Sequence, residues 1–318
     1  MSHLYRIAKN TFCEAIREPV YFLMLLIALL LTGHFPWMTL FVFFEQLKLV
    51  VDSSMATAML FGILVAELCA SHTVSREMRN GTVLLLLSKP VPRWSFVLGK
   101  IAGIVLASLL FCMICCCASV ISVYIAVDQF RMDLTLYGIF MAICAVGCVF
   151  GMAMNFIRGS SFSEFATYAL AVLTAGMALY CYKFQPHPNL SLTDLAKALT
   201  VVNLAVVVMA TMAVVVASRF DVIATLCICT AFFFLGLMSS YLFAAPAGGD
   251  ASLFADFCYA LIPNWQFFWL ADALAVDKRI PAEYVKLAVI YTVIYCVILS
   301  AWGVAIFQNR EAAGDNTN

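Results

Sequence analysis

Long apolar stretches alternate with short charged ones along the whole sequence. A low-charge run of about 20 residues is long enough for a helix to cross a membrane. We therefore predict eight spanning helices, the third of which is longer than a bilayer requires. Their predicted ranges are Val20–Phe44, Met55–Thr73, Phe96–Val127, Leu134–Ile157, Phe165–Tyr182, Ala198–Ala217, Val222–Ala244 and Val285–Phe307. The stretch 158–217 also fits one span plus a re-entrant segment.

The first residues follow a different pattern. Between residues 2 and 18, apolar side chains recur at helical spacing, with Arg6, Lys9 and Arg17 among the polar positions between them. This pattern predicts an amphipathic helix that lies in the membrane interface. No small-residue cleavage site follows the next apolar run, so a secretory signal is not expected.

Composition supports an all-α, polytopic integral membrane protein that forms one transmembrane domain over residues 1–318. Apolar residues make up 64% of the chain and charged residues 11%, and the mean hydropathy is +1.00. A soluble domain carries about 25% charged residues, so a water-soluble enzyme and a disordered chain are both excluded. The 18 basic and 18 acidic residues balance, and the charge indicates no nucleic-acid partner.

The distribution of Lys and Arg predicts the topology, because basic residues concentrate on the cytoplasmic side of a membrane. Most of the 18 basic residues fall on one side if the N-terminus is cytoplasmic. An even number of spans then returns the C-terminus to the cytoplasm, with residues 74–95 in a cytoplasmic loop and 245–284 in an outward loop. We expect the protein in the plasma membrane, which is the inner membrane in a Gram-negative cell.

The sequence offers little catalytic chemistry. The Gly99-Lys100 pair lacks the rest of a phosphate-binding loop, so we expect no ATP hydrolysis by the chain alone. The four histidines are too scattered to predict a metal site. Most of the 13 cysteines lie in apolar runs and are expected to pack as small hydrophobic residues. Two alternatives are a disulfide at Cys258 and a soft-metal conduit. The conduit would use Cys112, Cys115, Cys116, Cys117, Cys144 and Cys148.

The loop at 74–95 has the most distinctive pattern. It starts with charged residues, continues with the apolar run Val83–Leu87, and stops at Pro90-Val91-Pro92. Such a segment can form a short helix parallel to the membrane. Gly99 and Gly103 then open the next span with a face for close helix packing. An ordinary positively charged loop is the alternative.

These residues carry a resemblance to a known family. The run from Glu77 through Gly81-Thr82 to Lys89-Pro90-Val91-Pro92-Arg93, followed by Leu98-Gly99-Lys100, resembles the hallmark of type-2 ATP-binding-cassette (ABC) transporter permeases. More narrowly, it is similar to the branch linked to multicopper-enzyme maturation. Ala8–Phe12, Leu261–Gln266 and the ending Phe307–Glu311 resemble other segments of that branch. Many members have six spans, so eight would be six plus an extra pair.

The resemblance implies a division of labour between subunits. It implies that the loop is a coupling helix that docks on a separate cytoplasmic ATPase, which binds the ATP, and that the permease itself needs no cofactor. It also implies a second permease chain, either identical or related, so that a dimer forms an export pathway within membrane lipid. The positions that carry this coupling role are Arg76, Glu77, Arg79, Gly81, Thr82, Lys89, Pro90 and Arg93.

Two further features stand out within or next to the spans. Glu67 is an acidic residue inside a predicted span, which marks a functional candidate; the alternative is that it pairs with Arg76 or His72 near the inner surface. Trp265, Phe268 and Trp269 share one helical side. They predict an aromatic belt at the outer interface or, alternatively, an outer gate.

Three functions remain compatible with the sequence. The first is a permease subunit that exports a substrate with ATP hydrolysed by a partner. The second is a non-transporting scaffold or assembly factor driven by the same kind of ATPase. The third is a secondary transporter, which would require several charges within the membrane, and Glu67 alone is thin support for it.

Overall fold

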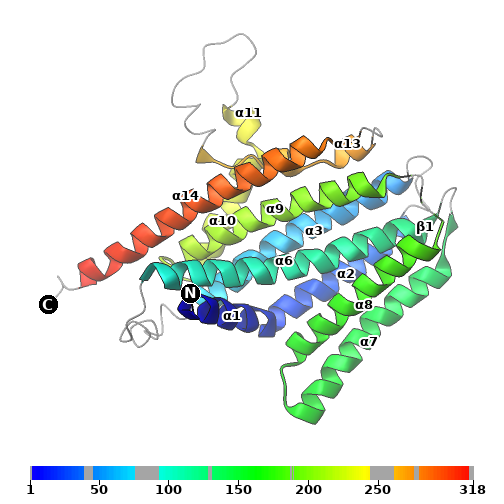
Figure 1. Cartoon of the computed structure of the whole chain (residues 1–318), viewed down its shortest axis with the longest axis horizontal. Coiled ribbons are helices and arrows are strands. Elements are labelled where there is room, and N and C mark those ends of the chain that lie inside the picture. The colour runs from blue at the N-terminus through cyan, green and yellow to red at the C-terminus, as the bar shows by residue number, and fades with distance from the viewer. Residues whose placement is uncertain are drawn as a thin grey trace, which may run out of the picture.

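The computed structural model describes residues 2–38, 46–75, 93–127, 131–186, 188, 190–243, 261–275 and 279–314. These residues form a bundle of long helices (Figure 1). The first half contains α1 (Ser2–Arg17), α2 (Pro19–Met38), α3 (Gln46–Ala70) with a π-helical turn η2 (Ser71–Ser75), α6 (Arg93–Ile125) and α7 (Leu134–Arg158). The second half contains α8 (Phe162–Phe184), α9 (Leu192–Ala217), α10 (Val222–Leu237), α11 (Ser239–Phe243), η3 (Trp265–Phe268), α13 (Ala271–Ala275) and α14 (Ala282–Gly314). A two-residue pair, β1 (Ala126–Val127) and β2 (Arg131–Met132), joins α6 to α7.

The predicted all-α membrane fold is confirmed, but the predicted count of eight spans is one too many, because one of the eight helices is too short. Within the described ranges, seven helices are long and apolar enough to cross a membrane. The predicted span Val222–Ala244 is interrupted: α10 ends at Leu237, and the separate helix α11 follows Met238. A helix of 16 residues is about 24 Å long, shorter than the roughly 30 Å hydrocarbon core.

The chain nevertheless returns across the bundle between α9 and α14. These two helices are parallel neighbours, because Lys197 near the start of α9 hydrogen-bonds the Ile280 carbonyl just before α14, and Gly303 faces Val215 near the end of α9. The start of α10 therefore lies at one end of the bundle and the start of α14 at the other. The far end of α14 lies at the same end of the bundle as α1 (Figure 1).

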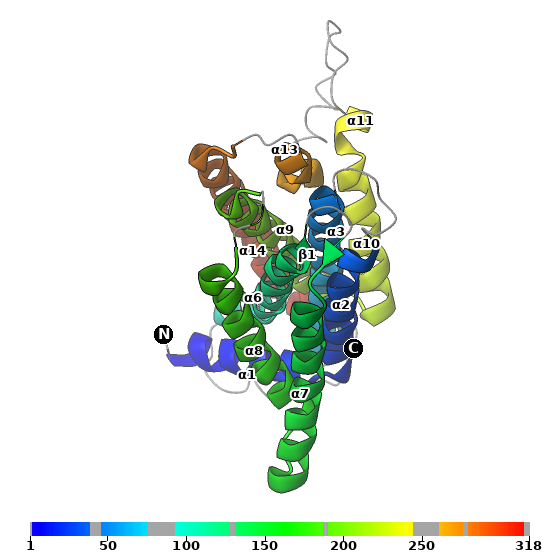
Figure 2. The same ribbon diagram turned by 90° about the vertical axis from the view of Figure 1, so that its right-hand side faces the viewer.

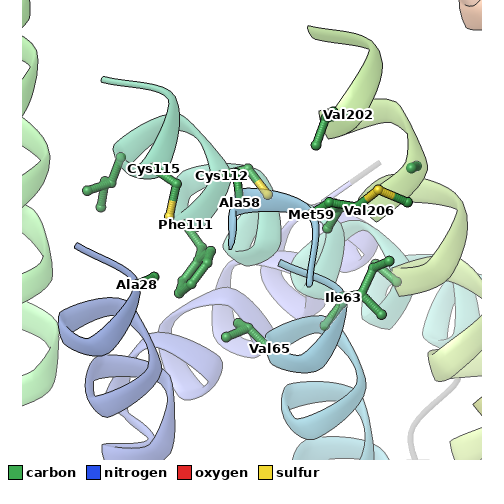
Figure 3. Packing of buried hydrophobic residues seen from close by; sticks show 14 of the residues in the cluster. Ala28, Ala58, Met59, Ile63, Val65, Phe111, Cys112, Cys115, Val202 and Val206 are labelled. Atoms are coloured by element: carbon green, nitrogen blue, oxygen red, sulfur yellow. The ribbon is translucent and has the colours of Figure 1, made fainter. Parts of the chain in front are cut away.

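Helices α2, α3, α6 and α9 form the core. Figure 3 shows side chains from all four helices meeting, among them Ala28, Met59, Phe111 and Val206. Helix α9 is the most enclosed, because its small and β-branched residues from Val201 to Ala217 are mostly buried around the whole circumference. The stretch 158–217 therefore contains two full-length helices and not one span with a re-entrant segment.

Two more exposed layers flank the core. Helices α7 and α8 form a hairpin on one side, seen at the lower right of Figure 1, and α14 lies on the opposite side. Gly147 and Gly151 of α7 pack directly on Leu170 and Ala166 of α8. Large apolar side chains of α7 and α14 remain exposed, as expected for helices that contact lipid.

The N-terminal helix α1 has the predicted extent and amphipathic pattern, but its environment differs from the expectation. Ala8, Thr11, Ala15 and Ile16 are buried. They are covered by protein, because α1 packs mainly along the start of α6 and also touches α2 and α8. The apolar face of α1 therefore serves as a helix-packing surface, and only its opposite side, with Arg6 and Lys9, is exposed.

Candidate functional site

The predicted coupling positions lie almost entirely outside the described residues. This applies to Arg76, Glu77, Arg79, Gly81, Thr82, Lys89 and Pro90. Arg93 begins α6, but its side chain is not described. The coupling helix therefore stays a prediction. The structure describes the two helices between which this loop runs, α3 with η2 on one side and α6 on the other.

Helix α6 meets α1 at two glycines directly after the loop. A Cβ at Gly103 would lie 2.7 Å from the Ala8 carbonyl oxygen and 2.6 Å from the Thr11 Cβ. At Gly99 a Cβ would lie 2.8 Å from Ile7. Only a residue without a side chain allows two helix backbones to approach so closely. The close packing predicted from these glycines is confirmed, and its partner is the N-terminal helix.

Charged groups surround this junction. The Lys100 side chain is 3% exposed; its Nζ lies 3.9 Å from a Glu14 carboxylate oxygen and over the Phe96 ring. At the end of α1, Arg17 Nε donates to Glu164 Oε2 at 2.7 Å, which raises the pKa of the Arg17 guanidinium. This ion pair ties the end of α1 to the first turn of α8.

Glu67 lies near the end of α3 and faces α10. Its carboxylate is 1% exposed and accepts a hydrogen bond from the Thr230 hydroxyl of α10, with 3.3 Å between the oxygens. His72 faces elsewhere, toward a small cavity beside Glu18 and Tyr21. The alternative in which Glu67 pairs with His72 is therefore wrong, and Arg76 lies outside the described residues. No described basic side chain forms an ion pair with Glu67.

The outer aromatic residues are placed differently from the expectation. Trp265 and Phe268 lie in the short 3-10 helix η3 and are fully buried against one another and against Phe233 and Tyr291. An aromatic belt requires side chains that reach the membrane interface, so this interpretation is wrong for these two residues. Trp269, just after η3, is partly exposed. An outer gate stays a prediction for all three.

A groove opens beside this aromatic cluster, between α3 and α10. Its walls are mostly apolar or aromatic, and its outer rim carries Gln266, Trp269 and Asp272. The remaining lining residues are Ala56, Met59, Leu60, Phe233, Phe234, Leu237 and Trp265. Asp272 is the one ionisable group among the residues that line it. Sequence reasoning missed this groove, because its walls come from segments that are far apart in the chain.

The membrane cysteines behave as packing residues. Cys112 and Cys115 are buried in the core near Phe111 (Figure 3), and Cys116 lies 3.5 Å from the Asn203 side-chain oxygen. In the part of the chain that the structure describes, no group of three or more His, Cys, Asp or Glu side chains is placed to hold a metal ion. Cys258, the candidate for a disulfide, lies outside that part.

The seven long apolar helices of the described residues define the class of a polytopic integral membrane protein. A family model described as ABC-2 family transporter protein matches residues 17–175. This is half of the 318-residue chain, so the chain belongs to the ABC-2 family of transporter proteins. A search of curated proteins gave no match. The family match does not test the narrower resemblance to permeases linked to multicopper-enzyme maturation, which stays a prediction.

Proposed function

We propose that the chain is the membrane subunit of an ABC exporter, powered by ATP that a separate cytoplasmic ATPase subunit hydrolyses. The observation that carries this proposal is the family match, which spans α2 to α8 and includes the segment predicted to couple to an ATPase. The sequence supports it because the chain has no phosphate-binding loop of its own. A second permease chain would complete the pathway as a homodimer or a heterodimer.

The packing around α6 suggests how motion at the loop would reach the membrane. Helix α6 begins where the loop ends and contacts α1, α2, α3, α8, α9 and α14. Tyr21 of α2 hydrogen-bonds the Ala107 carbonyl of α6 at 2.9 Å, and Ser122 of α6 hydrogen-bonds the Thr32 carbonyl of α2 at 2.8 Å. Displacement of the first turns of α6 would therefore move α1 and α2 with it.

Topology supplies a first test of this proposal. The end of the bundle that contains α1 and the loop at 74–95 would face the cytoplasm. A thiol label at Ser88→Cys should then react only from the cytoplasmic side, and a label at Gly249→Cys only from outside, in a variant whose native exposed cysteines are replaced. The reverse pattern would place the loop out of reach of a cytoplasmic ATPase.

Association with an ATPase supplies the direct test. The full chain, purified without a crosslinker, should retain an ATPase subunit that mass spectrometry identifies. Glu77→Lys or Gly81→Trp should release this subunit while membrane insertion stays normal, because neither residue lies in a predicted span. Loss of a desolvated charge contact costs about 2–5 kcal/mol, enough to release a micromolar partner. Thr193→Lys, at the opposite end of the bundle, is the matched control and should retain the partner.

A further inference from the structure

The contact between α3 and α10 has features that packing alone does not explain. Helix α10 touches α3 much less extensively than α6 or α9 does. Along this contact, which we call the α3–α10 seam, the same two helices carry the groove beside Trp265 and the Glu67–Thr230 pair. Figure 2 shows α10 beside α3 at the edge of the bundle.

Helical spacing shows that the groove and the buried carboxylate share one seam. Leu60 lines the groove and lies seven residues before Glu67, so both project from the same face of α3. On α10, Phe233, Phe234 and Leu237 line the groove and lie three, four and seven residues after Thr230. The Glu67–Thr230 pair therefore lies about one to two turns deeper than the groove, between the same two helix faces.

The seam opens to the surroundings of the bundle along its length. Leu60 is 48% exposed, Leu64 is 40% exposed and Phe234 is 59% exposed. All three belong to apolar helices, and we expect their exposed surface to contact lipid. A guest dissolved in the membrane could enter the seam sideways without crossing the protein core.

The ionisable groups along the seam are acidic. Asp272 lies at the rim, Glu67 lies at the deep end, and neither the groove lining nor the described ion pairs place a Lys or Arg beside them. A buried, ionised carboxylate with one neutral donor is costly unless it takes up a proton or a cation compensates it. Phe233, Phe234 and Trp269 add aromatic faces, which attract cations through their ring quadrupoles.

We propose that the α3–α10 seam is a binding site for amphipathic organic cations that enter from the membrane. The apolar body of the guest would lie between Leu60 and Phe234, and its positive charge between Asp272 and Glu67. This inference rests on the proposed function, since it assigns a substrate class to the exporter. An anionic or neutral amphiphile would gain the same apolar contacts but would leave both carboxylates uncompensated.

Two ions of equal shape and opposite charge test the inference. The full chain in nanodiscs of zwitterionic phosphatidylcholine would be titrated with tritiated tetraphenylphosphonium, and separately with tetraphenylborate, with empty nanodiscs subtracted. We expect saturable binding of the phosphonium cation and none of the borate anion. Equal saturable binding of both ions, or no saturable phosphonium binding, would overturn the proposal.

Isosteric variants locate the site within the chain. Glu67→Gln keeps an acceptor for Thr230 but removes the charge, and it should weaken phosphonium binding at least about tenfold, which corresponds to about 1.4 kcal/mol. Asp272→Asn at the exposed rim should weaken it about threefold. Asp221→Asn, at the other end of α10, is the matched control and should leave binding unchanged. Unchanged binding in Glu67→Gln, or equal weakening in Asp221→Asn, would contradict the assignment.

These measurements contain no ATPase and no ATP. Phosphonium binding with the predicted charge dependence would stand even if no ATPase partner were found, and only the exporter proposal would then fail. If the partner is found but the binding is absent, the seam assignment alone fails.

Discussion

Helix α3 and its neighbour α6 each contact a short helix, and the two contacts differ in kind. At the α1–α6 junction, Gly99 and Gly103 bring two backbones into direct contact, and no space remains for a side chain. At the α3–α10 seam the contact is small, a groove separates the helices, and a buried carboxylate has one neutral partner. We therefore expect the first contact to move as one body, and the proposed binding site requires the second to part around a guest.

The largest expected effect concerns Trp265, which lies at the end of the seam farthest from Glu67. Trp265 is fully buried and packs on Gly236 so closely that a Cβ there would collide with the indole. Trp265→Ala should lower the free energy of unfolding by about 3–5 kcal/mol, because it leaves a large cavity. Thermal unfolding in detergent measures this, with Trp269→Ala as the partly exposed control. A small effect of Trp265→Ala would mean that α10 is not held at this point.

The next effect tests the α1–α6 junction. Gly103→Leu should destabilise the protein by about 1–3 kcal/mol, because the new side chain would overpack the contact with Ala8 and Thr11. Gly176→Leu in α8 is the matched control, since nothing lies within 4 Å of a Cβ there. This control should gain about 0.5–1 kcal/mol from helix propensity. Equal melting temperatures for the two variants would contradict the rigid junction.

The smallest effect is expected inside the seam. Glu67→Gln and Glu67→Leu should each change the free energy of unfolding by less than about 1 kcal/mol, because replacing a poorly compensated buried charge is often neutral or stabilising. The same thermal unfolding assay measures both variants. If either variant lowers the free energy of unfolding by more than about 3 kcal/mol, Glu67 is needed for stability and is not a residue retained for binding.

The sequence predicted the parts of this fold that depend on local pattern. These parts are seven of the spans, the amphipathic helix at residues 2–18 and the packing glycines. They follow from the periodicity of apolar residues and from residue size, both of which can be read directly from one sequence. The end of α10 at Leu237 was missed because residues 222–244 carry no charge, so the average hydropathy hides the break at Met238, although Gly236, Ser239 and Ser240 lie around it.

The candidate sites were harder to predict, because they depend on contacts between distant segments. The sequence singled out Glu67 correctly as a buried carboxylate, but its partner Thr230 lies 163 residues away. Trp265 and Phe268 have the composition of an interface belt, and only the packing of α10 and α14 around them shows that they are enclosed. No pattern in the sequence indicated that Asp272 lies at the rim of the groove.

The central claim is that this chain transmits the work of a separate ATPase into the membrane. The most direct measurement is the rate of ATP hydrolysis in lipid nanodiscs for the chain alone, for its co-purified ATPase alone, and for the two together. The account predicts no hydrolysis by the chain alone and faster hydrolysis by the complex than by the free ATPase, with the increase lost in Glu77→Lys. Hydrolysis by the isolated chain, with contaminating ATPases excluded, or the same rate with and without the chain, would contradict it.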